Sequence, residues 1–179
     1  HGARGQAEGE GAIAYKACAS CLLPLGDVAG CHVVTVEGLS TGELTLVQRL
    51  IIEHNASQCG FCTPGIVLSL TGFCLESPTF SYEDAIDALD GNICRCTGYV
   101  AIRDAARSLC DRLAHVDRNP ARRVAVLIEA GVLPAYFTEI PARLERPSAT
   151  ACGDKGVLVA GGTDLFVQKP EQLFESDLC

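Results

Sequence analysis

The feature that most constrains this chain is a set of four cysteines in two close pairs. Cys59 and Cys62 form a C-x2-C motif, and Cys94 and Cys96 form a C-x-C motif after an interval of 31 residues. Because each pair lies on one short turn, only two segments have to converge to present four thiolates. The pattern predicts a metal site, and spacing alone leaves structural zinc, an iron–sulfur cluster and two disulfides as alternatives.

The cysteine count and the net charge indicate in which cellular compartment this site lies and which class of partner it lacks. The chain has 11 cysteines, an odd number, and no visible signal peptide, so a reducing, cytoplasmic setting is expected rather than a disulfide framework. The net charge of −8 argues against nucleic acid as a partner. No apolar run has membrane-spanning length, so no membrane association is expected. The absence of Met, with His1 first, suggests a fragment of a longer gene product.

Both cysteine pairs precede segments that are expected to be helical. Thr63 can cap a helix, and Pro64 suits its first position, which predicts a helix over about 64–75. Thr97 can cap a second helix over about 98–113. Helix N-termini carry unpaired N–H groups and partial positive charge, and both features favour an anionic, thiolate-ligated site.

Two further helices are predicted in the same region. An apolar stripe after Thr45 indicates a helix over 45–54, and a capping box that starts at Ser81 indicates one over 82–89. The four helices would form a compact all-α unit. Cys74 and Cys110 lie on apolar helix faces and are expected in its core.

The flanking segments give weaker signals. Residues 1–14 are expected to form a loop, and the β-branched run before Gly38 predicts a strand. Residues 114–146 are polar and punctuated by proline, which is typical of a linker that includes a short helix near 127–133. Near the C-terminus, a buried-strand pattern runs into Gly161-Gly162; this is compatible with a plain strand–turn or with a phosphate-binding loop.

The residues around the cysteines carry a resemblance to a known family. QCGFCTPG and GNICRCTGY, with their 31-residue interval, resemble the helical 2Fe–2S domain of the xanthine dehydrogenase (molybdenum hydroxylase) family. ACASCLLPL and VVTVEGL are similar to the end of the plant-type ferredoxin domain that precedes it. VLVAGGTDL resembles the first pyrophosphate loop of the FAD domain that follows it.

The resemblance implies an α+β chain with four parts. These are the end of a ferredoxin-like β domain (1–40), an all-α four-helix 2Fe–2S domain (41–113), a linker (114–146) and the start of an α+β FAD-binding domain (147–179). Cys59, Cys62, Cys94 and Cys96 would ligate one cluster. Cys21 would be one ligand of a second cluster, whose remaining cysteines lie outside the sequence. Cys18 and Cys31 match no ligand position.

The resemblance also implies contacts with two organic cofactors. Gln58 and Cys96 would face the molybdopterin of a partner chain. FAD would contact the residues Leu158, Val159, Ala160, Gly161, Gly162, Thr163, Asp164 and Leu165. Arg95, a lone cation in an acidic segment, is either a solvated side chain or a residue that tunes the cluster potential.

The function that follows from the resemblance is electron transfer. Substrate would be oxidised on a molybdopterin-binding large subunit, and electrons would pass through the 2Fe–2S clusters to FAD and then NAD. The rest of the ferredoxin and FAD domains would come from outside the sequence. The alternatives are the electron-transfer subunit of an aldehyde oxidase or carbon-monoxide dehydrogenase relative, and a zinc-stabilised interaction module without a redox role.

Overall fold

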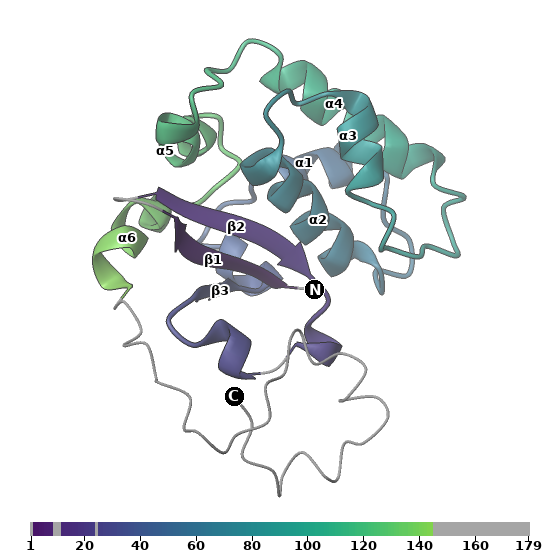
Figure 1. Ribbon diagram of the computed structural model, residues 1–179. Coiled ribbons are helices and arrows are strands. Elements are labelled where there is room, and N and C mark those ends of the chain that lie inside the picture. The colour runs from purple at the N-terminus through teal and green to yellow at the C-terminus, as the bar shows by residue number, and fades with distance from the viewer. Residues whose placement is uncertain (1, 9–11, 24, 145–179) are drawn as a thin grey trace, which may run out of the picture.

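The structure, a computed structural model, describes residues 2–8, 12–23 and 25–144 (Figure 1). Its strands are β1 (Gly2–Glu8), β2 (Ala12–Cys18) and β3 (His32–Val34). Its α-helices are α1 (Leu46–Glu53), α2 (Thr63–Glu76), α3 (Tyr82–Asp87), α4 (Val100–Leu113), α5 (Arg123–Glu129) and α6 (Ile140–Arg143). Short 3₁₀ helices are η1 (Ser20–Leu22), η2 (Leu25–Val28), η3 (Val36–Leu39), η4 (Pro120–Arg122) and η5 (Ala135–Glu139).

The three strands form an antiparallel sheet in the order β2-β1-β3. Gly2 pairs with Cys18 at one edge of β1, and Ala3 pairs with Val34 at the other. The loop expected over residues 1–14 is therefore wrong for β1 and for the start of β2. A strand with partners on both edges gains its backbone hydrogen bonds from tertiary pairing, which overrides its weak intrinsic preference. The predicted strand before Gly38 is also shorter than expected, because the chain turns into η3 at Val36.

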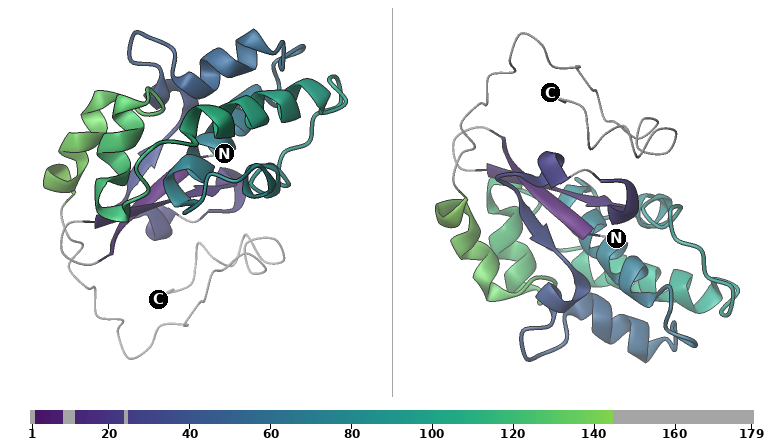
Figure 2. Two further views of the ribbon diagram at one scale, coloured as in Figure 1. Left: turned by 90° about the horizontal axis from the view of Figure 1, so that it is seen from above. Right: turned by 90° about the horizontal axis from the view of Figure 1, so that it is seen from below.

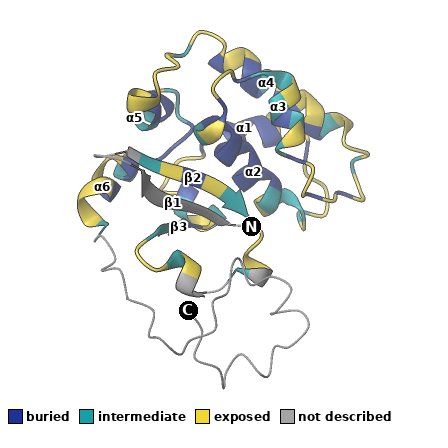
Figure 3. Cartoon of the chain, in the orientation of Figure 1, coloured by how far each residue is buried: buried dark blue, intermediate teal, exposed yellow. Residues whose placement is uncertain are grey.

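Helix α2 is the central element of the molecule. Residues 66–74 are all buried, as Figure 3 shows for most of this helix. A helix that is apolar on every side must be covered all round. It is covered by β1 and β2 on one side and by α1, α3 and α5 on the others (Figures 1 and 2). Gly72 makes the closest approach to the sheet, since a Cβ built there would lie 2.9 Å from Ala17 Cβ.

All four predicted helices of the 41–113 region are present, each within about two residues of its expected bounds. Thr45 forms a capping box with Gln48 at the start of α1, and the Ser81 hydroxyl accepts from the Asp84 amide at the start of α3. The expected core positions of Cys74 and Cys110 are confirmed, with 0% and 8% exposure. Among the described residues, no helix combines the length and apolar character that crossing a bilayer requires.

Residues 120–144 pack against the rest of the molecule instead of leaving it. Leu127, Val132 and Phe137 are buried in the same core as α2. Ile140 and Pro141, which were expected within the linker, begin the helix α6. Pro141 lies in the first turn of α6, where its missing N–H leaves no helical hydrogen bond unmade.

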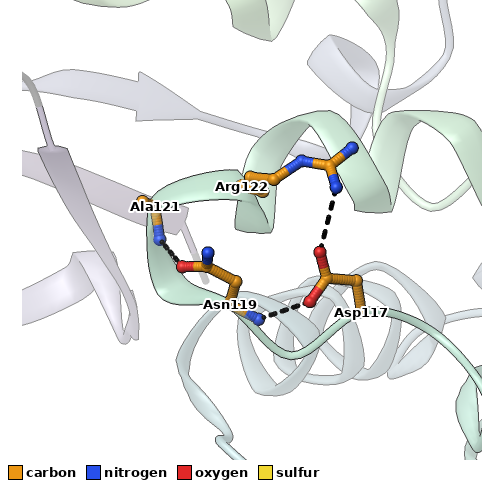
Figure 4. A network of polar contacts seen from close by, with 4 residues as sticks. All are labelled: Asp117, Asn119, Ala121 and Arg122. Carbon is orange, nitrogen blue, oxygen red and sulfur yellow. Dashed lines mark hydrogen bonds and ion pairs between the residues drawn. The ribbon is translucent and has the colours of Figure 1, made fainter.

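A small polar network precedes this packed segment (Figure 4). The Asp117 carboxylate accepts from the backbone N–H of Asn119 at 3.0 Å and from Arg122 Nη1 at 3.1 Å. Asn119 Oδ1 accepts from the Ala121 amide at 3.0 Å and so caps η4. Side chains thus satisfy backbone N–H groups at the turn, which redirects the chain from α4 toward α5.

Candidate metal centre

The first cysteine limb is a closed loop that runs from Ser57 to Thr63. The hydroxyls of these two residues lie 2.7 Å apart, and the Thr63 amide donates to Gly60 O at 3.2 Å. Gly60 has a φ of +83°, a left-handed conformation that glycine adopts at little cost. Cys62 occupies the N-cap of α2 without a side-chain cap. The predicted capping role of Thr63 is wrong, because its hydroxyl closes the loop on Ser57.

The second limb is held at two points. Asn92 is buried, and its Nδ2 donates to Ser69 Oγ of α2 at 2.7 Å. At the other end, the Cys94 amide donates to Tyr99 Oη at 3.0 Å. Tyr99 has a φ of +67°, which is uncommon for a residue with a side chain. The limb therefore folds back on itself before α4 begins at Val100.

Thr97 lies inside this fold of the second limb. Its hydroxyl accepts from the Tyr99 amide at 3.2 Å and lies 3.1 Å from Cys94 Sγ. The prediction that Thr97 caps the following helix is wrong, because Tyr99 is the N-cap residue of α4 and the helix starts one residue after it. The hydroxyl links the Tyr99 amide to the Cys94 sulfur and caps no residue within the helix.

The two limbs bring the four thiols together in pairs, each pair with one member from each limb. Cys96 Sγ lies 3.4 Å from Cys59 Sγ, and Cys62 and Cys94 are close enough for each thiol to shift the pKa of the other. The first pair is exposed. In the second pair Cys94 is buried and Cys62 is half-buried. The site therefore has an outer pair and an inner pair.

Within each pair, one thiol ionises more readily than the other. Hydrogen bonds from the Thr97 hydroxyl and then the Thr97 amide lower the pKa of Cys94 to about 7. Burial, followed by the neighbouring Cys94, raises the pKa of Cys62 to about 11. In the outer pair, hydrogen bonds from the Phe61 amide and then from the Cys96 thiol lower the pKa of Cys59. The same hydrogen bond between the two thiols raises the pKa of Cys96.

The donor set fits a [2Fe–2S] cluster, which takes two ligands on each of two irons. Among the described residues, no three Cys, His, Asp or Glu side chains are grouped as a single metal ion requires. Two pairs of thiols match the two ligands that each iron of such a cluster takes. Cys62 lies at the N-terminus of α2, and the C-x-C limb leads into α4, so both helix dipoles favour negative charge here.

The residues next to the site that are expected to contact a cofactor or to tune the cluster potential are exposed. Gln58 and Arg95 are both exposed, and each adjoins a cysteine of the outer pair. Cys21 is exposed on η1. The residues expected to contact FAD, Leu158 to Leu165, lie outside the described residues. Two large apolar residues that adjoin cysteines of the site are also exposed. The exposed fraction is 93% for Phe61 and 77% for Ile93.

Three residues of the site were not found from the sequence. Ser69 and Asn92 anchor the second limb, and Tyr99 holds the Cys94 amide. Polar residues next to a cysteine motif are a weak signal, because their partners lie elsewhere in the chain. Only the packing of the limb on α2 shows which of them touch it.

Comparisons with known proteins agree with this geometry. Residues 35–107 match the family model described as [2Fe-2S] binding domain. A xanthine dehydrogenase from Dictyostelium discoideum is 43% identical over 102 residues, which are 56% of this chain and 8% of the relative. Aldehyde oxidase 1 from Cavia porcellus is 47% identical over 98 residues, 54% of this chain and 7% of the relative.

Two further matches extend the set of relatives. A xanthine dehydrogenase from Emericella nidulans is 50% identical over 91 residues, which are 50% of this chain and 7% of the relative. The solved structure of quinoline 2-oxidoreductase from Pseudomonas putida 86 is 36% identical, with a TM-score of 0.46 over 65% of this chain and 64% of that one. The chain thus spans less than a tenth of the length of these curated relatives.

Proposed function

We propose that this chain, in which residues 35–107 form a [2Fe-2S] binding domain homologous to part of xanthine dehydrogenases and aldehyde oxidases, is the electron-transfer component of a xanthine dehydrogenase. The observation that carries the proposal is the meeting of four thiols in two pairs on converging limbs, with Cys96 Sγ 3.4 Å from Cys59 Sγ. A [2Fe–2S] cluster bound there accepts and releases single electrons. Cys59, Cys62, Cys94 and Cys96 are its proposed ligands.

The surroundings of the thiols support transfer to a partner protein. The outer pair is exposed, so an electron has a short path to the surface. Phe61 and Ile93 directly precede the two cysteines of the inner pair, and both are far more exposed than large apolar residues usually are. Apolar side chains gathered at one surface are typical of an interaction site. The proposed partner is a molybdopterin-binding large subunit that covers this surface.

Gln58 is the proposed contact to the pterin. It adjoins Cys59, which meets Cys96, so Gln58 and Cys96 lie at the same end of the site. The Gln58 amide is exposed and can both donate and accept hydrogen bonds, which suits the mixed edge of a pterin. A cluster-bound Cys96 sulfur would accept a weak hydrogen bond from the same ligand.

The remaining route is proposed from the sequence patterns. Cys21 would ligate a second [2Fe–2S] cluster that includes cysteines of the ferredoxin part. Leu158 to Leu165 would line FAD, and NAD would be the final acceptor. The division into parts at residues 40, 113 and 146 belongs to the same proposal. An aldehyde oxidase or carbon-monoxide dehydrogenase relative would use the same ligands with another substrate.

Metal analysis tests the first step of this proposal. Protein purified without oxygen should contain iron and acid-labile sulfide, absorb visible light and give a paramagnetic signal after one-electron reduction. Cys96→Ser should weaken cluster retention, whereas Cys31→Ser should not, because the Cys31 thiol is hydrogen-bonded to backbone carbonyls in η2 and the following turn. Stoichiometric zinc with neither iron nor sulfide would reject the electron-transfer role.

Rapid mixing tests the partner step. Gln58→Ala should retain the cluster and the fold but slow its reduction by substrate in the assembled enzyme. Reduction of the same variant by dithionite bypasses the partner and should keep its wild-type rate, which makes it the control. A wild-type rate of reduction by substrate, with the pterin fully bound, would remove Gln58 from the proposed contact.

A further inference from the structure

We propose that Thr97 is a positioning residue that raises the reduction potential of this site by donating a hydrogen bond from its hydroxyl to Cys94 Sγ. The proposal rests on the ligand assignment above, and it names a residue that acts through a ligand without being one. Thr97 Oγ1 lies 3.1 Å from Cys94 Sγ, within hydrogen-bond range for sulfur.

The direction of this hydrogen bond follows from its neighbours. The Tyr99 amide donates to Thr97 Oγ1 at 3.2 Å, so this oxygen already accepts one hydrogen bond. A hydroxyl has one proton to give and two lone pairs. A cysteine that ligates iron has lost its proton and can only accept. The hydroxyl proton of Thr97 is therefore directed to the sulfur.

The surrounding limb fixes the backbone on both sides of Thr97. Tyr99 holds a left-handed conformation, and its hydroxyl oxygen accepts from the Cys94 amide at 3.0 Å, so the chain from 94 to 99 is a closed turn. Asn92 fixes the start of the limb to Ser69 through a buried hydrogen bond. One anchor on each side of Thr97 holds the limb in this fold, with the Thr97 hydroxyl 3.1 Å from Cys94 Sγ.

This contact distinguishes Cys94 from the other three thiols. Backbone amides and other thiols account for the hydrogen bonds of Cys59, Cys62 and Cys96 in the part of the chain that the structure describes. Thr63 offers an internal comparison, because it also follows a cysteine closely. Its hydroxyl bonds Ser57 at 2.7 Å.

A hydrogen bond to a ligand sulfur stabilises the more negative, reduced form of a cluster. Bonds to charged sulfur are stronger than neutral ones, because the acceptor carries charge. Loss of the hydroxyl should shift the one-electron reduction equilibrium roughly tenfold toward the oxidised form, a decrease of ~59 mV for a one-electron couple.

The test compares Thr97→Val and Thr97→Ala with Thr97→Ser and the matched control Thr63→Val. Spectroelectrochemical titration of the iron-loaded proteins should give a lower potential for Thr97→Val and Thr97→Ala only. Electron–nuclear double resonance of the reduced proteins in H₂O and D₂O should show an exchangeable proton that both of these variants lack. Thr97→Ser should restore the potential and the proton.

The outcomes separate this inference from the proposed function. A wild-type protein without iron and sulfide would reject the function and this inference with it. Iron-loaded Thr97→Val or Thr97→Ala with the wild-type potential and exchangeable proton would overturn the inference and leave the function standing. An equal decrease in Thr63→Val would also overturn it, because that hydroxyl is hydrogen-bonded to Ser57.

Discussion

Asn92 Nδ2 donates to Ser69 Oγ at 2.7 Å, and both side chains are buried. Ser69 lies two turns into α2, the same helix that has Cys62 at its N-cap. One helix therefore supports both cysteine limbs, the first through the chain itself and the second through this side-chain contact. The relative position of the two limbs depends on α2 remaining straight and buried.

Replacing Asn92 tests this link. Asn92→Ala leaves the Ser69 hydroxyl buried without its donor, and an unsatisfied buried polar group costs about 1–3 kcal/mol of unfolding free energy. Urea denaturation should show the loss, and cluster retention should weaken in parallel. Thr138→Val is the control, since this exposed hydroxyl lies in η5, outside both cysteine limbs, and should contribute no more than about 0.5 kcal/mol. Equal stability in both variants would mean that the buried contact contributes nothing.

The close approach of α2 to β2 gives a second prediction. In Gly72→Ala the new methyl would lie 2.9 Å from Ala17 Cβ, so helix and strand must move apart. Overpacking of this kind costs about 1–3 kcal/mol, more than the ~1 kcal/mol that alanine gains over glycine within a helix. Thermal unfolding should show a lower midpoint. Gly91→Ala, where none of the described residues lies within 4 Å of the new methyl, should not lower it. A stabilised Gly72→Ala protein would contradict the packing.

The contact between the sheet and η5 should be sensitive to acid. His32 Nδ1 lies 2.8 Å from Tyr15 Oη, the rings of Tyr136 and Phe137 pack on His32, and burial and then Arg143 lower its pKa. The unfolded chain takes up this proton near pH 6.5, and the folded chain takes it up only at lower pH. The unfolded state therefore binds more protons in that window, and stability falls as the pH falls.

Chemical denaturation at pH 7.5 and pH 5.5 measures this effect. The loss of unfolding free energy between the two conditions should be smaller in His32→Gln than in the wild type. His54→Gln provides the control. The His54 imidazole lies at the C-terminal end of α1 and is hydrogen-bonded to Ser108 of α4, so it takes no part in the ring contacts around His32. An unchanged pH dependence in His32→Gln would show that His32 does not titrate differently in the two states.

Arg123 is a buried cation with an incomplete set of partners. Its guanidinium lies 4.7 Å from the centre of the Phe80 ring, and Nη2 donates to Arg118 O at 3.5 Å. Nη1 is buried and has no hydrogen-bond partner among the described residues, and burial lowers the pKa of the group. Replacing a poorly paired buried charge by an apolar side chain of similar length is neutral or stabilising. Arg123→Met should therefore unfold with a free energy equal to the wild type or up to ~1 kcal/mol higher.

The neighbouring arginine supplies the comparison for this variant. Arg122 is exposed, and its ion pair with Asp117 at 3.1 Å is of the surface kind, which contributes about 0–1 kcal/mol. Arg122→Met should change little. A loss above ~1 kcal/mol in Arg123→Met, measured by urea denaturation, would mean that its contact with Phe80 outweighs the cost of burying the charge.

Local chemistry was sufficient to predict much of the helical unit. The cysteine spacing indicated two limbs, the apolar periodicity located α1, the capping residue Ser81 located α3, and Pro64 marked the start of α2. Thr45 and Ser81 cap the helices that the sequence predicted for them. These features depend on residues within one or two turns of each other, so they are visible without a fold.

Contacts between distant residues were decided by the tertiary structure alone. The sequence could not show that Cys59 meets Cys96, that Asn92 reaches Ser69, or that residues 2–8 become the middle strand of a sheet. Each depends on how segments pack around α2, and packing is set by the summed burial of residues far apart in the chain. Thr97 shows the difference most directly. The sequence identified a residue suited to cap a helix, and the folded limb directs its hydroxyl to a cysteine sulfur instead.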